Sequence, residues 1–214
     1  GGSCAHDDKY VVASQACNTQ PCPFSGTNNA TTNWDSDGGC GKPIYLDKQN
    51  VDCGSNKGLN KIHLNDNWNG NQWRYEFTCI GTGGGTVQSV NNKKYTKSNE
   101  MKDRCSEGQY LDRHNVDCGN NSVLSQFHLE RNDDWGTPND DWARYQYTCL
   151  NFSNNLSCRT LNSSVANNWG GNVANIGPAD MVCNSDEAIG RFQLKTGGNN
   201  GQGLAYYEYT CCKL

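Results

Sequence analysis

The phrase Tyr45-Leu-Asp-Lys-Gln-Asn-Val-Asp-Cys53 returns as Tyr110-Leu-Asp-Arg-His-Asn-Val-Asp-Cys118, at an offset of 118 − 53 = 65 residues. Cys183 lies at the same spacing again and marks a third, less similar copy. Each copy continues to an aromatic segment that ends in cysteine, at 75–79, 145–149 and 207–211. A repeat at a fixed period indicates copies of one supersecondary unit that bury a shared core. The chain therefore contains three units, at about 40–80, 105–150 and 158–214.

The closing segments have the alternation of half-buried strands. In unit 1, Tyr75, Phe77 and Cys79 alternate with Glu76 and Thr78, which is the period of two typical of a strand with one buried face. No stretch carries an apolar stripe at helical spacing between caps, and an isolated hairpin is only marginally stable in water. We predict an all-β fold over residues 40–214, in which three pseudo-symmetric β-repeats pack as one prism-like or trefoil-like domain.

Cysteine is expected to reinforce a small core. Hydrophobic residues make up 34% of the chain, which holds 13 cysteines and 24 glycines, a composition typical of disulfide-tied secreted domains. Because equivalent positions should have equivalent partners, the expected disulfides are Cys53–Cys79, Cys118–Cys149 and Cys183–Cys211. In the chain-entropy model each contributes roughly 3–4 kcal/mol. The spacing lacks the paired pattern of cysteines and histidines found in zinc sites, so no metal is expected from it.

Charge and sequons indicate a secreted, extracellular protein. The formal net charge is −4 without a basic cluster, so nucleic acid is not expected as a partner. No apolar run reaches the roughly 20 residues that span a membrane. The chain starts without a signal peptide and is interpreted as a mature or trimmed form. Possible acceptors of N-linked glycans are Asn29, Asn120, Asn151, Asn155 and Asn162.

The N-terminal residues 1–23 form a separate segment, which holds Cys4 and the phrase Cys17-Asn-Thr-Gln-Pro-Cys22-Pro23. This phrase resembles the C-terminal end of a thrombospondin type 1 repeat, although that family's upstream tryptophans and arginines are absent. The resemblance implies a module cut inside a longer parent, and the alternative is a short arm whose cysteines pair with the main domain. The odd cysteine total allows a disulfide-linked second chain or a homo-oligomer.

Two polar stretches are expected to be linkers. Residues 24–39 are rich in asparagine, threonine and glycine, which favour turns. Residues 81–102 separate units 1 and 2 and include Lys93, Lys94 and Lys97. These lysines could bind an anion, but they are interpreted as a solvated face.

The repeat resembles the dermatopontin family. The segments that carry the resemblance are Gly190-Arg-Phe-Gln-Leu194, Tyr209-Thr-Cys211-Cys212 and Asp141-Trp142-Ala-Arg-Tyr-Gln-Tyr-Thr-Cys149. The family's tryptophan four residues before the closing cysteine is tyrosine here, and its Asp-Arg pair is missing. The three-copy, disulfide-tied organisation is also similar to the threefold β-prism at the C-terminus of apicomplexan perforin-like proteins. Both resemblances imply an extracellular, non-enzymatic domain: the first family joins matrix and adhesion partners, with lectin-like and toxin-like relatives, and the second targets membranes.

No catalytic motif is found in the sequence. Asp47 and Asp52 recur as Asp112 and Asp117, and paired carboxylates could serve glycoside hydrolysis. Their repetition in two copies instead favours turn residues that cap their own backbone. We therefore do not expect an enzyme.

Two loops are the candidate binding sites. They contain Asn65, Asp66, Asn67 and Trp68 in unit 1, and Asn132, Asp133, Asp134 and Trp135 in unit 2. An indole can stack on a sugar ring while amides and carboxylates bind its hydroxyls, and repeated weak sites add avidity. The alternative is that each tryptophan covers a sheet edge. The same oxygen atoms could bind calcium.

Histidines and the third unit complete this prediction. His63 and His128 lie between apolar strand positions and are expected to point outward, either as plain surface residues or as a repeated ligand contact. The loop of unit 3 is glycine-rich, so its site is interpreted as lost, with Tyr206 as the nearest substitute. The predicted function is lectin-like binding of cell-surface or matrix glycans. A membrane-engaging toxin or pore-targeting domain, or a structural matrix protein with protein partners, is the alternative, so membrane contact is left open.

Overall fold

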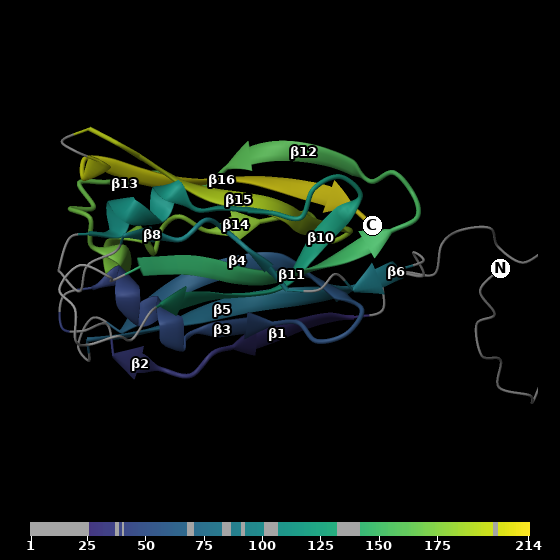
Figure 1. The fold of residues 1–214 in the computed structure, drawn as a ribbon, viewed down its shortest axis with the longest axis horizontal. Coiled ribbons are helices and arrows are strands. Elements are labelled where there is room, and N and C mark those ends of the chain that lie inside the picture. Colours follow the sequence, from purple (N-terminus) through teal and green to yellow (C-terminus); the bar gives the residue numbers. More distant parts are fainter. Residues whose placement is uncertain are drawn as a thin grey trace, which may run out of the picture.

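The computed structural model describes residues 26–36, 39, 41–67, 71–82, 87–90, 93–100, 107–131, 142–198 and 201–214. In these residues the chain forms strands and short 3-10 helices, arranged as three sheets (Figure 1). The predicted disulfide-rich, all-β fold is therefore confirmed. The thrombospondin-like phrase lies outside the described residues, and that resemblance stays a prediction.

Each sheet is built around the long hairpin of one unit. Sheet A consists of β1 (Thr27–Thr31), β2 (Asp35–Ser36), β4 (Lys57–Asn67), β5 (Gln72–Gly81) and β14 (Met181–Val182). Sheet B consists of β3 (Asn50–Asp52), β6 (Val87–Val90), β7 (Lys94–Tyr95), β8 (Asn99–Glu100), β10 (Ser122–Arg131) and β11 (Trp142–Phe152). Sheet C consists of β9 (Asn115–Asp117), β12 (Ser157–Asn162), β13 (Ala166–Asn167), β15 (Glu187–Gly197) and β16 (Leu204–Lys213). The 3-10 helices are η1 (Pro43–Lys48), η2 (Gly108–Arg113) and η3 (Val173–Ile176).

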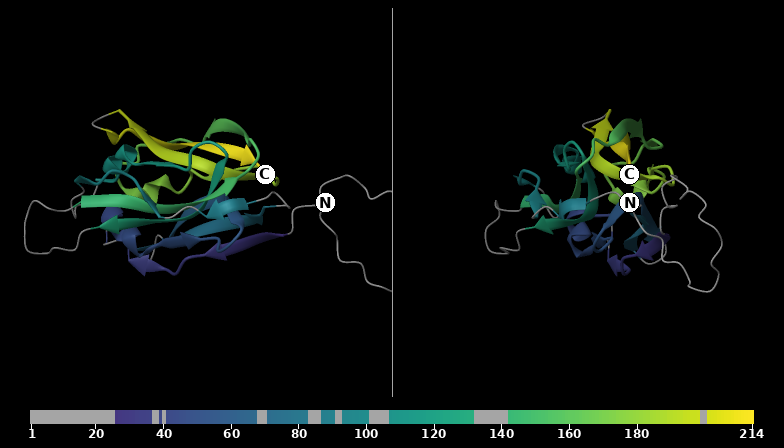
Figure 2. Two further views of the ribbon diagram at one scale, coloured as in Figure 1. Left: turned by 45° about the vertical axis from the view of Figure 1, so that its right-hand side comes forward. Right: turned by 90° about the vertical axis from the view of Figure 1, so that its right-hand side faces the viewer.

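Every unit contributes a short strand to the sheet of the next unit. β3 of unit 1 pairs with β10, β9 of unit 2 pairs with β15, and β14 of unit 3 pairs with β4. Because the third pairing returns to unit 1, the exchanges form a closed cycle. The three sheets surround a common core, as the view along the long axis shows (Figure 2, right). Whether the units pack as a prism or as a trefoil stays a prediction.

The same backbone contact closes each junction of the cycle. The first strand of every long hairpin shifts register at one residue, and these residues are 65 apart: Asn60, Ser125 and Gly190. Such a bulge leaves one residue outside the ladder. Its carbonyl here accepts a hydrogen bond from a cysteine N–H of another unit: Cys53 to Ser125 at 2.9 Å, Cys118 to Gly190 at 3.0 Å, and Cys183 to Asn60 at 3.0 Å. The third bulge needs glycine, because a β-carbon on Gly190 would lie 2.9 Å from Cys212 Sγ.

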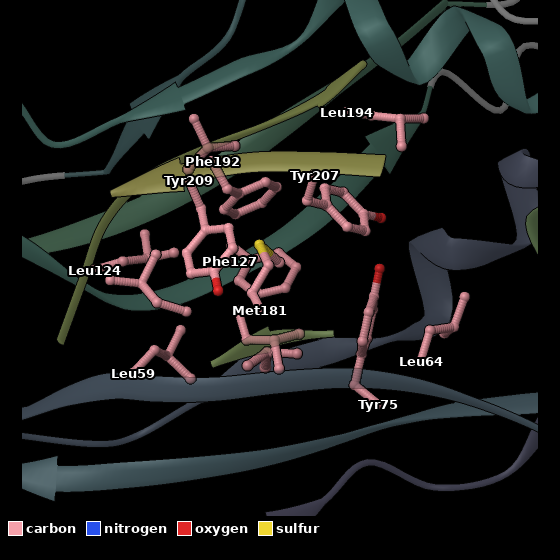
Figure 3. Close-up of a cluster of buried hydrophobic side chains, with 14 of the residues drawn as sticks. Leu59, Leu64, Tyr75, Leu124, Phe127, Met181, Phe192, Leu194, Tyr207 and Tyr209 are labelled. Atoms are coloured by element: carbon pink, nitrogen blue, oxygen red, sulfur yellow. The ribbon is translucent and has the colours of Figure 1, made fainter. Parts of the chain in front are cut away.

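Equivalent side chains of the three units line the shared core. Ile62, Phe127 and Phe192 are spaced by 65 residues and are all buried. The rings of Phe127 and Phe192 meet edge to face with their centroids 5.2 Å apart, and Figure 3 shows them among the surrounding leucines. Burial of a side chain of this size contributes roughly 1.5–3 kcal/mol. One apolar core is therefore supplied jointly by all three units.

Three tyrosines lie next to this aromatic pair. Tyr75, Tyr145 and Tyr207 are all buried, and their burial raises the pKa of each phenol above its usual value. In Figure 3 the hydroxyls of Tyr75 and Tyr207 turn toward each other. The hydroxyls remain protonated and serve as polar contacts inside the core.

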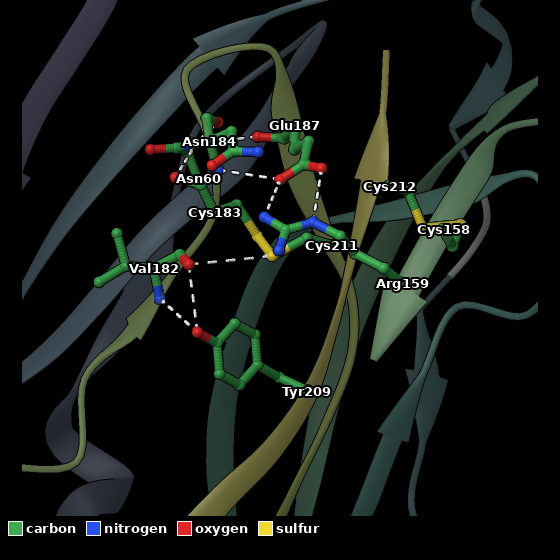
Figure 4. Close-up of a disulfide and its surroundings, with 10 residues drawn as sticks. All are labelled: Asn60, Cys158, Arg159, Val182, Cys183, Asn184, Glu187, Tyr209, Cys211 and Cys212. Atoms are coloured by element: carbon green, nitrogen blue, oxygen red, sulfur yellow. Dashed lines mark hydrogen bonds and ion pairs between the residues drawn. A yellow bond between two sulfur atoms is a disulfide. The ribbon is translucent and has the colours of Figure 1, made fainter. Parts of the chain in front are cut away.

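Four disulfides reinforce the described part of the fold. Three of them are the predicted pairs, Cys53–Cys79, Cys118–Cys149 and Cys183–Cys211. The fourth joins Cys158 to Cys212 across a separation of 54 residues and was not predicted. It ties β12 to β16 beside the Cys183–Cys211 pair (Figure 4). The remaining 13 − 8 = 5 cysteines lie outside the described residues.

The stretches expected to be linkers contain strands, which corrects that prediction. β1 and β2 fall within 24–39 and pair with β5, whereas β6, β7 and β8 fall within 81–102 and pair with β11. Near each group of edge strands, a side-chain hydroxyl accepts a hydrogen bond from the backbone N–H of a core tyrosine. The Tyr75 N–H donates to Thr32, the Tyr145 N–H to Thr96 and the Tyr207 N–H to Ser163, at 2.8–2.9 Å. These edge strands are attached to the sheets mainly by hydrogen bonds and bury little apolar surface. Their sequence therefore lacks the alternation of apolar and polar residues that is typical of the inner strands.

Candidate functional site

Residues of two units meet at three corners of the fold. η1 packs against β10, η2 against β15 and η3 against β4, so each corner combines a 3-10 helix of one unit with a hairpin strand of the next. We name them the η1, η2 and η3 corners. η1 and η2 carry the repeated Tyr-Leu-Asp of the opening phrase, at 45–47 and 110–112. The three corners can be compared position by position.

An ion pair fills the η1 corner. Arg131 Nε lies 2.5 Å from Asp47 Oδ2, and these side chains are only 15% and 17% exposed. The Arg131 guanidinium is also 5.7 Å from the centre of the Tyr45 ring, and Lys48 Nζ is 5.0 Å from it. Arg131 therefore pairs with the carboxylate of this corner, and cations lie over its aromatic ring.

The η2 corner has threonine where the η1 corner has arginine. Thr196 is the equivalent of Arg131, because 196 − 131 = 65. Its Oγ1 donates a hydrogen bond to Asp112 Oδ2 at 2.7 Å, but the side chain is too short to fill the space of a guanidinium group. The corner holds an open concavity of about 460 Å³, within the usual size of ligand sites. We name it the η2 groove; it is lined by Gln109, Tyr110, Asp112, Arg113, Thr196 and Gly197.

The η2 groove combines polar groups with an aromatic ring. Gln109 Oε1 is buried and has no hydrogen-bond partner within the described ranges. A buried oxygen in this situation costs roughly 1–3 kcal/mol unless a donor reaches it. The guanidinium of Arg113 lies 4.2 Å from the centre of the Tyr110 ring, and Asp112 adds a carboxylate. The groove is thus lined by an amide, a carboxylate, a cation and a ring, and the cation covers one face of the ring.

The η3 corner lacks the repeated tyrosine and aspartate. Gly177 stands at the position of Asp112, since 177 − 112 = 65, and Asn175 stands at the position of Tyr110. The Asn175 amide is engaged locally, because its Nδ2 donates to the Trp169 carbonyl at 3.0 Å. The three corners have therefore diverged, and the η2 corner retains both repeated side chains together with open space.

A buried histidine follows η2 directly. His114 is 1% exposed, and its Nδ1 lies 3.0 Å from Thr96 Oγ1. Burial lowers the pKa of His114 from 6.5 to about 4; Arg113 lowers it further, and Asp112 acts in the opposite direction. The ring is neutral near pH 7 and helps to fix the end of η2 beside the groove.

The predicted tryptophan loops are described only in part. Trp68, Asn132, Asp133, Asp134 and Trp135 lie outside the described residues, so their sugar contacts, and a calcium site built with them, stay predictions. Asn65, Asp66 and Asn67 are the last residues of β4. Asn65 Nδ2 donates to Glu76 Oε1 at 2.7 Å, so this amide braces the outer face of sheet A.

The two predicted histidines lie on different sheets and are half-buried. His63 Nδ1 is 2.5 Å from Asp180 Oδ1, whereas His128 Nε2 is 3.7 Å from Glu130 Oε1. Burial lowers the pKa of His128, and Glu130 opposes this shift. The structure does not bring the two histidines together, and each contacts an acidic side chain.

The turn interpretation is confirmed for two of the four repeated aspartates. Asp52 accepts a hydrogen bond from the Gly54 N–H, and Asp117 accepts one from the Gly119 N–H, both at 2.7 Å. Asp47 and Asp112 instead face the η1 and η2 corners. Sequence reasoning missed the η2 groove, which borders the glycine-rich loop of unit 3 that was expected to lack a site. The sequence signal for this groove is the difference between two equivalent positions of the repeat, arginine at 131 and threonine at 196.

One cluster with metal-ligand chemistry occurs among the described residues. It consists of Cys183, Glu187 and Cys211, but the two sulfur atoms are bonded to each other. A sulfur in a disulfide is not a thiolate ligand. We therefore do not assign a metal to this cluster.

Comparison of the chain with protein-family models, with curated proteins and with solved structures gives no match. In the described ranges, no helix combines the length and apolar character needed to cross a bilayer. The geometry of the corners is therefore the basis on which a function is proposed.

Proposed function

We propose that this protein is a secreted, non-catalytic binding protein whose η2 groove holds a glycan. A sugar ring presents a C–H face that packs on an aromatic plate and hydroxyls that pair with polar groups. Tyr110 supplies the ring, on the face that the Arg113 guanidinium does not cover, while Gln109 and Asp112 supply acceptors and Arg113 supplies donors. Disulfides persist in oxidising compartments, and the four in this structure are consistent with an extracellular protein.

The observation that carries this proposal is the difference between two equivalent corners. Arg131 and Asp47 neutralise each other in the η1 corner, whereas Thr196 leaves the η2 corner open with Asp112 at its wall. Gln109 adds a buried oxygen without a hydrogen-bond partner among the described residues. A purely structural corner would gain more from the ion pair than from an unfilled groove.

A glycan array with variants of Thr196 tests the proposal. Thr196→Arg copies the filled η1 corner into the η2 corner, and Thr196→Ser is the matched control that retains the hydroxyl. We expect selective binding of one sugar class by the wild-type chain and by Thr196→Ser, and its loss in Thr196→Arg. Asp112→Asn removes a charged acceptor, whose hydrogen bond is worth roughly 1.5–3 kcal/mol, so affinity should fall roughly 10- to 150-fold. The array is run with and without a calcium chelator.

Two results would contradict this proposal. Unchanged binding by a folded Thr196→Arg protein would remove the η2 groove as the site, and Trp68→Ala and Trp135→Ala would then test the two loops. A blank array from a chain with an intact fold would argue against a glycan ligand. Liposome co-sedimentation would next test the membrane-engaging alternative.

A further inference from the structure

Two of the five sequons lie on edge strands of the sheets. Asn29 is in β1, which pairs with β5, and Asn162 is the last residue of β12, which pairs with β16. In the described part of the fold, each of these strands has a pairing partner on one side only. Asn29 is opposite Thr78 and Asn162 is opposite Glu208. These partners belong to the outward face, because their neighbours Phe77 and Tyr209 are core residues, so both asparagines face outward.

Asn29 is placed to carry a sugar without loss of its own contact. The residue is exposed, and its Oδ1 accepts a hydrogen bond from Thr78 Oγ1 at 2.8 Å. That bond uses the carbonyl oxygen of the amide and leaves Nδ2, the atom that a glycan modifies. An open hollow of about 310 Å³ adjoins Asn29 and is bordered by Lys61, Glu76 and Thr78. A first sugar residue could therefore lie on the outer face of sheet A.

Asn162 has the same setting in unit 3. It is exposed, and Ser164, the hydroxyl residue of its sequon, is exposed as well. Glu208, opposite Asn162, is held by Arg191 through a hydrogen bond of 2.9 Å. The outer face of sheet C is therefore polar next to this asparagine and can be covered by sugar without loss of apolar packing.

Asn151 provides an internal contrast. It lies in β11 between β10 and β6, so its backbone is paired on both sides. Its Nδ2 donates to Ser89 Oγ at 2.9 Å, and its Oδ1 accepts from Ser122 Oγ at 2.8 Å. A glycan on Nδ2 would displace Ser89 and disturb the pairing of β11 with the edge strand β6. Asn151 is the sequon least compatible with modification.

We propose that Asn29 and Asn162 carry N-linked glycans that cover the open edges β1 and β12. The co-reactant is a lipid-linked oligosaccharide pyrophosphate of the secretory pathway. The amide nitrogen forms a bond to C1 of the first sugar and loses one proton, while the bond from C1 to the lipid pyrophosphate breaks and the pyrophosphate leaves. This proposal requires passage through the secretory pathway but does not depend on the η2 groove.

The glycans would prevent pairing between sheet edges. An edge strand presents unpaired N–H and C=O groups that can pair with another chain. β12 is exposed along nearly its whole length, and β1 nearly so, and neither has a proline. Branched sugars on the outer face next to these edges would obstruct an approaching strand and keep the molecules apart.

Mapping of glycan occupancy tests the first part of the proposal. The chain is secreted from a eukaryotic cell, treated with peptide N-glycosidase in heavy-oxygen water, and each sequon is read by peptide mass spectrometry. We expect Asn29 and Asn162 to be occupied and Asn151 to be unmodified. Absence of glycan from Asn29 or Asn162, or full occupancy of Asn151, would overturn the assignment.

Removal of the sequons tests the second part. Thr31→Ala and Ser164→Ala abolish the two sequons and leave both asparagines in place, and Ser153→Ala abolishes the Asn151 sequon as the matched control. In sedimentation velocity, the Thr31→Ala, Ser164→Ala double variant should self-associate with rising concentration, whereas the wild type and the control should not. A double variant that lacks both glycans and sediments like the wild type would overturn the edge-covering role.

Discussion

Replacement of Asn60 by alanine tests the junction that closes the cycle of units. Asn60 is 7% exposed, and its Nδ2 donates to the Asn184 carbonyl at 2.7 Å and to the Glu187 carbonyl at 2.8 Å. Figure 4 shows Asn60 reaching from β4 into this turn of unit 3, which Arg159 braces through Glu187. Alanine would keep the backbone junction with Cys183 but lose these two bonds, together with the longer contact of Asn60 Nδ2 with the Cys183 carbonyl at 3.5 Å.

The expected loss of stability follows from these two bonds. A hydrogen bond of this kind contributes about 0.5–1.5 kcal/mol, so Asn60→Ala should lower the free energy of unfolding by about 2 kcal/mol. For a chain of this size, 1 kcal/mol corresponds to roughly 2–4 °C in Tm, which gives a decrease of about 4–8 °C. Ser125 is the equivalent bulge residue and makes one longer bond, 3.3 Å, to the Thr148 carbonyl. Ser125→Ala should therefore cost less than about 1 kcal/mol.

Thermal unfolding followed by circular dichroism, under oxidising conditions, provides the comparison. Both variants are measured beside the wild type at one pH and one protein concentration. If Asn60→Ala is no less stable than Ser125→Ala, the side chain of Asn60 does not hold the third junction. The reasoning from its two hydrogen bonds would then be wrong.

Three further predictions concern other parts of the molecule. Replacement of Cys158 and Cys212 by serine opens a 54-residue loop, so in urea titrations the free energy of unfolding should fall by about 4 kcal/mol; a loss below about 1 kcal/mol would contradict this. Burial lowers the pKa of His114 from 6.5 to about 4, so between these pH values the unfolded chain binds a proton that the folded chain does not. The free energy of unfolding is therefore at its full value above pH 6.5 and falls by up to about 3 kcal/mol toward pH 4. A His114→Gln variant whose stability falls as steeply over this pH range would refute His114 as the cause. Arg131→Thr leaves Asp47 without its cation and should lower the free energy of unfolding by about 2–4 kcal/mol, and adding Asp47→Asn should restore part of this loss. If the effects of the two substitutions are additive in this double-mutant cycle, the ion pair contributes nothing to stability.

The sequence predicted the inner strands and three disulfides well, because these depend on equivalent positions. Cys53 and Cys79 recur with the same surroundings in each unit, so the arrangement of one copy constrains the other two. Cys158 and Cys212 have no counterpart among the described pairs, and their bond was not predicted. The edge strands were missed because Thr32 and Thr96 hold them through hydroxyl bonds, which leave no apolar period in the sequence.

The closed cycle and the η2 groove depend on contacts between units. β3 and β9 are three residues long, and nothing in Asn-Val-Asp specifies which sheet they join. Thr196 stands at the position in unit 3 that is equivalent to Arg131 in unit 2, but this difference is informative only when η2 is known to pack against β15. Pairings of this kind join residues distant in sequence, where local pattern carries little information.

Each junction of the cycle joins one unit to another through backbone hydrogen bonds. These contacts do not require the two units to belong to one polypeptide chain. Three separate chains of one unit each could in principle form the same contacts, but each association would cost an estimated 4–15 kcal/mol in lost translational and rotational freedom. The tandem chain avoids this cost and corresponds physically to a homotrimer fused into one polypeptide. Fusion also removes the requirement that the copies be identical. One corner can then be filled by an ion pair while its neighbour keeps an open groove.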